Sequence, residues 1–171
     1  DTFTWSHVAV DAASRRAAII DPVLDFDPVT GQVQTHSAQR LLEYITTTGL
    51  GVDWILETHI HADHLTAAAW LKARLEASGS KPRIGIGRGM LSVQRTFKQK
   101  LNLGDEFAAD GREFDVFFDD GAEITIGHLV GRAMTTPGHT ADSLSYLFGD
   151  AAFIGDTLFA PRSGSARCDF P

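Results

Sequence analysis

The stretch Thr58-His59-Ile60-His61-Ala62-Asp63-His64 decides how the rest of the chain is interpreted. It follows an apolar run that is typical of a buried strand and precedes an alanine- and leucine-rich run that is typical of a helix. His59 and His61 are two residues apart, so their side chains point the same way on an extended segment. Neutral imidazole and carboxylate are ligands for divalent zinc, iron or manganese. Three histidines and one aspartate at a strand end therefore predict a metal site.

Two later turns each present one further candidate ligand. The turn Thr136-Pro137-Gly138-His139-Thr140 follows a predicted strand and presents His139, and Gly155-Asp156-Thr157 follows another and presents Asp156. Each turn is a weak signal alone, because such residues are common in surface turns. Together they supply the additional ligands that the first cluster needs.

The composition limits the classes of protein to which the chain can belong. Its 171 residues are enough for one domain with a hydrophobic core, and no apolar run reaches the length that spans a bilayer. The net charge of −7 argues against a nucleic-acid-binding surface. A single cysteine, Cys168, excludes an internal disulfide and favours a reducing compartment. We therefore expect a cytoplasmic protein with neither a nucleic-acid nor a membrane partner.

The apolar pattern predicts strands and helices within a single domain over residues 1–171. Strands are expected at residues 6–10, 17–20, 52–57, 83–87, 124–126, 129–135, 144–148 and 151–154, and helices at 38–47, 65–77 and 91–101. Ser37 is expected to cap the first of these helices. This order suits helices packed outside a mixed sheet or a pair of sheets.

The three motifs, in this order, resemble those of the metallo-β-lactamase superfamily. The resemblance implies an α+β fold, an αββα sandwich with the metal at the edge between its two sheets. Family members continue past the sequence Asp169-Phe170-Pro171. The resemblance therefore also implies that residues 1–171 lack the C-terminal part of the fold.

The sequence around these motifs narrows the resemblance to one branch of the family. After Asp156, the chain carries Gly164, Arg167 and then Asp169-Phe170, which is similar to persulfide dioxygenases, also called sulfur dioxygenases. Residues 19–27 and 84–87 resemble the bacterial β-lactamase hydrolase-like members of that branch. The resemblance implies an enzyme that oxidises glutathione persulfide with O2 to sulfite and glutathione.

The same resemblance implies roles for individual residues. It implies a single Fe(2+) held by His59, His139 and Asp156, a facial triad with open positions that suits oxygen activation. The remaining candidates surround that ion: His61 as a further metal ligand, Asp63 and His64 as catalytic groups that orient ligands or bound water, and Arg167 as a substrate-binding group with forked donors.

A glyoxalase II-like thioester hydrolase (hydroxyacylglutathione hydrolase) is the main rival interpretation. It would bind one or two Zn(2+) ions, with His61 joining the first metal, Asp63 and His64 binding a second, and Asp156 bridging. Such sites take a further histidine from beyond the Asp156 loop, and the sequence has none there. A third interpretation is a non-catalytic metal-binding or sulfide-sensing protein. Each of these three interpretations is compatible with a homodimer.

Overall fold

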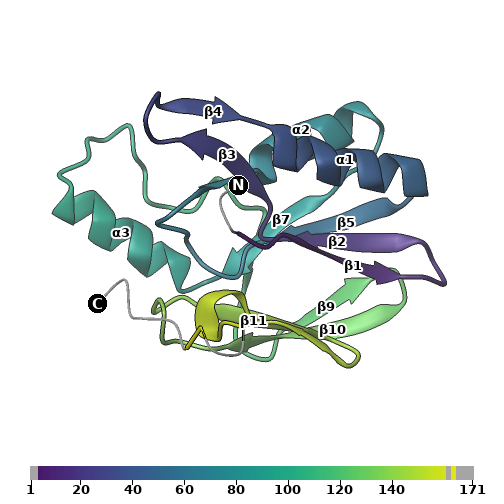
Figure 1. The fold of residues 1–171 in the computed structure, drawn as a ribbon. Coiled ribbons are helices and arrows are strands. Elements are labelled where there is room, and N and C mark those ends of the chain that lie inside the picture. Colours follow the sequence, from purple (N-terminus) through teal and green to yellow (C-terminus); the bar gives the residue numbers. More distant parts are fainter. Residues whose placement is uncertain (1–3, 161–162, 165–171) are drawn as a thin grey trace.

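The computed structural model describes residues 4–160 and 163–164, and it places their strands in two main sheets (Figure 1). One sheet has the order β1-β2-β5-β7-β8 and the other β12-β11-β10-β9. The first comprises β1 (His7–Asp11), β2 (Arg16–Ile20), β5 (Gly51–Leu56), β7 (Arg83–Gly87) and β8 (Val116–Phe118). The second comprises β9 (Glu123–Ile126), β10 (Leu129–Thr135), β11 (Leu144–Phe148) and β12 (Ala151–Phe153).

The other elements lie outside or beside these sheets. A small third sheet has the order β4-β3-β6, with β3 (Val23–Asp27), β4 (Gln32–Gln34) and β6 (Leu65–Thr66). The helices are α1 (His36–Thr48), α2 (Ala68–Ala77), α3 (Met90–Lys100) and the short 3-10 helix η1 (Gly155–Thr157). Of the residues that the structure describes, none form a helix long and apolar enough to cross a membrane.

Two apolar layers hold these elements together. The first sheet is buried on both faces, and the residues of β2 from Ala17 to Ile20 are fully inaccessible to solvent. Helices α1 and α2 cover its outer face, with Ile45 and Leu71 in that layer (Figure 1). Its inner face packs against the second sheet through residues such as Leu56 and Tyr146. Burial of these two apolar layers is the main favourable contribution to folding.

This arrangement confirms the predicted metallo-β-lactamase fold. The helices over the first sheet and the two facing sheets form three successive layers of an αββα sandwich (Figure 1). In the described part of the chain, no helix covers the outer face of the second sheet, and α3 lies to one side of the layers (Figure 1).

The connections between strands place the predicted ligands at one edge. Strands β2, β5 and β7 are parallel, so their carboxyl ends lie on the same side of the first sheet. The histidine-rich segment begins directly after β5, and Leu144 at the start of β11 donates a main-chain hydrogen bond to the carbonyl of Thr58 (2.8 Å). The two sheets are thus joined where the ligand-bearing loops leave them.

The structure corrects two details of the sequence analysis. Ser37 does not cap α1, because the helix begins at His36, two residues before the predicted start. The carboxylate of Asp25 in β3 instead accepts hydrogen bonds from the Ser37 N–H (2.8 Å) and hydroxyl (2.7 Å). The second helix begins at Ala68 rather than residue 65, because Leu65 and Thr66 pair with β3. The sequence analysis does not predict strands β3, β4, β6 and β8; the last three have only two or three residues each, which is too short for a periodic pattern to be recognised.

Replacing Asp25 by alanine is expected to destabilise the protein by about 1 kcal/mol, the usual cost of losing a side-chain cap at a helix start. Urea unfolding followed by circular dichroism would measure this cost. Ser37→Ala is the matched control, because it removes the hydroxyl and its bonds to Asp25 and Arg40 but leaves the main-chain N–H bonded to Asp25. A larger loss for Ser37→Ala than for Asp25→Ala would contradict this assignment.

Candidate metal centre

His59 is held so that one ring nitrogen is free for a metal. The buried carboxylate of Asp21 accepts hydrogen bonds from the N–H (2.7 Å) and hydroxyl (2.8 Å) of Thr58. Because the Thr58 hydroxyl hydrogen is used in this way, its oxygen accepts the proton on Nδ1 of His59 (3.0 Å). Nε2 of His59 therefore carries a lone pair, and this buried atom has no hydrogen-bond partner among the described residues. A metal ion would satisfy it.

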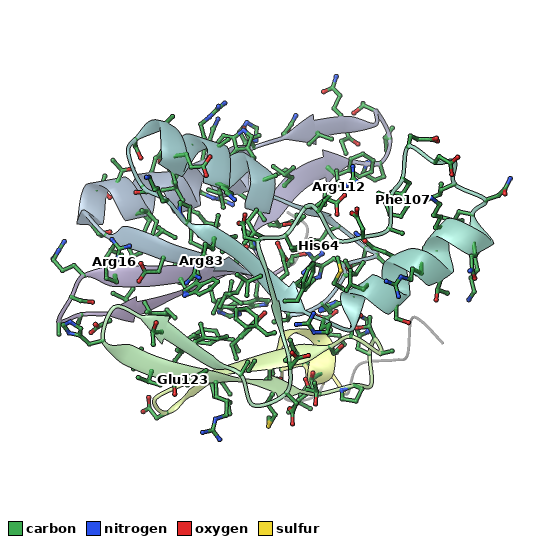
Figure 2. All side chains as sticks on the ribbon, turned by 180° about the vertical axis from the view of Figure 1, so that it is seen from behind. Arg16, His64, Arg83, Phe107, Arg112 and Glu123 are labelled. Atoms are coloured by element: carbon green, nitrogen blue, oxygen red, sulfur yellow. The ribbon has the colours of Figure 1, made fainter. Side chains whose placement is uncertain are left out.

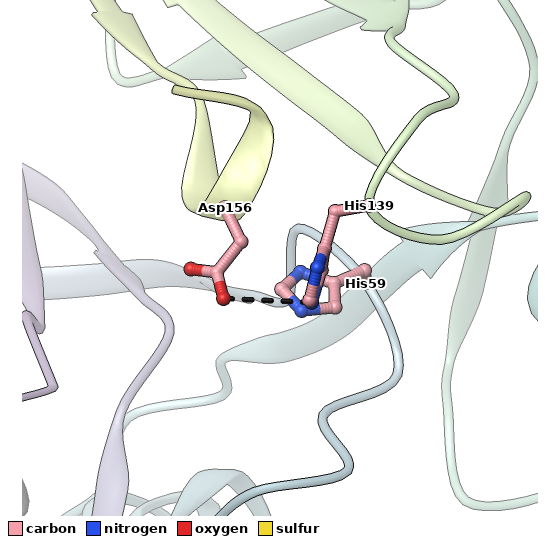
Figure 3. A group of neighbouring side chains, drawn as sticks. All are labelled: His59, His139 and Asp156. Atoms are coloured by element: carbon pink, nitrogen blue, oxygen red, sulfur yellow. Dashed lines mark ion pairs between the residues drawn. The ribbon is translucent and has the colours of Figure 1, made fainter. Parts of the chain in front are cut away.

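His139 and Asp156 complete a group with His59. Their side chains come from the loop after β10 and from η1, and Nε2 of His139 lies 3.4 Å from Oδ2 of Asp156 (Figure 3). One ligand atom from each of the three residues lies within 4.8 Å of the others. Two imidazoles and a carboxylate at this spacing fit one divalent transition-metal ion.

Gly155 allows Asp156 to reach this position. It has a left-handed backbone with φ of 48°, which an L side chain rarely adopts. A Cβ atom at this position would also lie 2.3 Å from the Thr58 hydroxyl oxygen, too close for any real contact. The turn that carries the carboxylate ligand therefore rests directly on the threonine that orients His59.

His61 belongs to a different set of contacts. Its Nε2 lies 3.1 Å from Oε2 of Glu57 and 3.4 Å from Oδ1 of Asp21, and both carboxylates are buried. Burial alone would lower the pKa of His61, but the hydrogen bonds to Asp21 and Glu57 outweigh it and raise the pKa to about 10. The ring of His61 is nevertheless adjacent to that of His59, with centroids 4.2 Å apart.

His61 also forms a second candidate metal group with Asp63 and His64. Nδ1 of His64 lies 3.2 Å from the Asp63 carboxylate, and its buried Nε2 has no hydrogen-bond partner in the described residues. Burial is the main cause that lowers the pKa of His64. These contacts leave a neutral imidazole nitrogen available for a second ion or for a bound substrate.

A cavity of about 590 Å³ opens beside these residues. Its polar wall includes Asp21, His61, Asp63, His64 and Asp156. Its apolar wall includes Trp5, Phe153, Leu158 and Phe159, and His7 lies among them. The volume is in the range of cavities that bind small-molecule ligands. Trp5 and His7 stack on each other at this wall, with ring centroids 6.4 Å apart.

The charged residues elsewhere on the first sheet lie away from this cavity. Arg16 and Arg83 stand at the starts of β2 and β7, at the opposite end of the sheet from His64 (Figure 2). The cavity wall itself carries three carboxylates, of which burial raises the pKa of Asp156. A cation at the centre would compensate this local negative charge.

The structure brings together most of the residues that the sequence singled out. His59, His139 and Asp156 form one group, and His61, Asp63 and His64 form a second. His61 also forms a third group with Asp21 and Glu57. Arg167, together with Arg162 and Cys168, lies outside the described residues. Sequence reasoning missed Glu57 and Thr58 as site residues. The signal that could have found Glu57 is an acidic residue at the end of the buried strand that leads into the ligands.

The chain belongs to the metallo-beta-lactamase superfamily, whose family model matches residues 13–170. Members of this superfamily are metal-dependent enzymes, and the chain carries the corresponding histidine and aspartate groups. Their reactions differ, so membership leaves the reaction of this chain to be determined from its site.

Some similar proteins are named as hydrolases and others as persulfide dioxygenases. The chain is 44% identical to a probable metallo-hydrolase of Burkholderia pseudomallei, over 99% of this chain and 60% of that protein. It is 27% identical to the mitochondrial persulfide dioxygenase ETHE1 of Homo sapiens, over 98% of this chain and 52% of that protein. The crystal structure of ETHE1 from Myxococcus xanthus superposes with a TM-score of 0.72 and 29% identity, covering 99% of this chain and 58% of that one. The chain thus spans about half to three fifths of the length of these relatives.

In the metal-free protein, His59 is expected to stay neutral down to about pH 3, while His61 keeps its added proton up to about pH 10. Burial, then the neighbouring charge of His61, lowers the pKa of His59 to about 3. The pKa of His59 is thus lower in the folded than in the unfolded protein. Its stabilising contribution is therefore complete above about pH 6.5 and declines as the pH falls.

Ring-nitrogen NMR of protein stripped with a chelator would measure both titrations. The same protein unfolded in urea is the control, in which both rings should titrate near pH 6.5. A midpoint near pH 6.5 for His59 in the folded protein would contradict the burial of its ring beside a charged His61.

Proposed function

We propose that this chain is the catalytic domain of a persulfide dioxygenase that uses a single Fe(2+) held by His59, His139 and Asp156. The observation that carries the proposal is the free, buried Nε2 of His59 within reach of His139 and Asp156. Two imidazoles and one carboxylate leave positions open for dioxygen and a sulfur ligand side by side. The similarity to ETHE1 of Myxococcus xanthus supports the same interpretation.

Each surrounding residue has a definable task in this reaction. Thr58 and Asp21 fix the tautomer of His59, so that the nitrogen facing the ion needs no deprotonation. Asp63 and His64 line the cavity and can orient bound water or the persulfide. A bound ferrous ion would supply the electron transfer to dioxygen that no protein side chain provides.

The proposed substrate is glutathione persulfide. Dioxygen and one water supply the three oxygens of sulfite, the sulfur–sulfur bond breaks, and glutathione leaves as the thiol. The cavity of about 590 Å³ offers apolar and polar walls to such a peptide. We retain Arg167 as the group that would bind a substrate carboxylate through its forked guanidinium.

Protein purified without oxygen and loaded with ferrous iron is expected to consume O2 only when glutathione persulfide is added. Asp156→Ala should lower iron content and O2 uptake at least about 100-fold, because even outer partners of metal ligands cost 10- to 100-fold. Asp110→Ala removes an equally charged residue from an exposed ion pair with Arg112 and should change neither. Equal activity of the two variants would contradict the proposed ligand set.

A glyoxalase II-like hydrolase with one or two Zn(2+) ions is the second candidate. The free Nε2 of His64, in a group with His61 and Asp63, favours it because such enzymes need a second metal there. The Burkholderia relative is named a probable metallo-hydrolase, which also favours a hydrolase. Bound zinc, turnover of S-lactoylglutathione and no persulfide-dependent O2 uptake would establish this candidate and exclude the dioxygenase.

A further inference from the structure

Glu57 is an acidic residue in the interior whose role the proposed reaction does not explain. It is 2% exposed and lies at the end of β5, two residues before His59. One carboxylate oxygen accepts the hydroxyl of Thr66, and the other lies 3.1 Å from Nε2 of His61. Its main-chain carbonyl accepts the hydroxyl of the buried Tyr146 (2.8 Å). Glu57 is therefore fixed in both its backbone and its side chain.

This contact determines what His61 can do. An ionised carboxylate only accepts hydrogen bonds, so Nε2 of His61 carries a hydrogen toward Glu57, and this nitrogen cannot donate a lone pair to a metal. Asp21 accepts from the same nitrogen at 3.4 Å and reinforces this orientation. His61 is accordingly absent from the group formed by His59, His139 and Asp156, although its ring neighbours that of His59.

Burying two carboxylates beside one imidazole carries a desolvation cost that apolar residues at the same positions would avoid. Taking charges out of water is costly, and in some proteins a buried ion pair contributes specificity rather than stability. The arrangement therefore calls for an explanation other than stability, and the adjacent ligand group provides one.

We propose that Glu57 is a positioning residue that withholds His61 from the metal ion, so that the ion is bound by two imidazoles and one carboxylate instead of three imidazoles. The proposal rests on the ligand set of the proposed function. Three imidazoles are typical of zinc sites that activate water, whereas two imidazoles and one carboxylate are typical of oxygen-activating iron. Glu57 would thus be a determinant of metal selectivity, acting through His61 without touching the ion.

The test counts imidazole ligands by X-ray absorption spectroscopy of the cobalt-loaded protein, a measurement that does not depend on turnover. We expect two imidazoles in the unmodified protein and three in Glu57→Ala, because the freed ring of His61 can turn toward the ion. The double variant Glu57→Ala/His61→Ala should return to two. The ratio of zinc to iron affinity should rise about 10-fold in Glu57→Ala, the scale of effects from outer partners of metal ligands.

Two further variants keep the test decisive. Tyr146→Phe removes the hydrogen bond to the main chain of Glu57 but leaves its carboxylate, and it should keep two imidazoles. If Glu57→Ala does not fold, Glu57→Gln preserves the volume, and its neutral amide holds Nε2 of His61 less tightly, so it should show the same shift toward zinc to a smaller degree.

The inference is overturned if the unmodified protein already shows three imidazoles, or if the count and the metal preference are unchanged in the folded Glu57 variants. Absence of persulfide-dependent O2 uptake in the unmodified iron protein would instead refute the proposed function. The imidazole count would still decide the role of Glu57 in that case, so the two failures are distinguishable.

Discussion

The hydrogen bond from the main-chain N–H of Leu144 to the carbonyl of Thr58 joins the two sheets at the edge where all the candidate ligands lie. Its two partners are far apart in the sequence, and each directly adjoins a loop that carries candidate metal ligands. A metal site needs its ligand atoms placed to within a fraction of an ångström. Because the loops themselves have little regular structure, this fixed junction between two packed sheets provides the required precision.

A chain of buried polar contacts extends from this junction. Asp21 holds Thr58, Thr58 orients His59, and Asp21 together with Glu57 holds His61. Asp21 itself has a left-handed backbone with φ of 48°, an uncommon conformation for a residue other than glycine. Such strain persists only where the surroundings fix it, and it is concentrated at functional sites. The tautomer of His59 therefore depends on one strained aspartate directly after β2, and the same aspartate lies beside His61.

The sequence was sufficient to predict the family fold, most helices and strands, and the residues of both ligand groups. His59 and His61 could be placed together because residues two apart on an extended segment point the same way. Their association with His139 and Asp156 was implied by the resemblance to the metallo-β-lactamase superfamily. The division of these residues into two groups could not be predicted, because it depends on which nitrogen of His61 faces Glu57. The start of α1 was also missed, since its capping carboxylate comes from Asp25 on another element.

The contact between Gly155 and Thr58 has a consequence for how this domain can vary. The two residues are almost a hundred positions apart, yet a methyl group on one would overlap the hydroxyl of the other. Exchanges at the two positions should therefore be strongly epistatic: a side chain at 155 is tolerated only beside a smaller residue at 58, and that smaller residue would no longer orient the imidazole of His59. Gly155 and Thr58 therefore constrain each other, and this constraint limits the substitutions by which this edge of the sheets can acquire a new reaction.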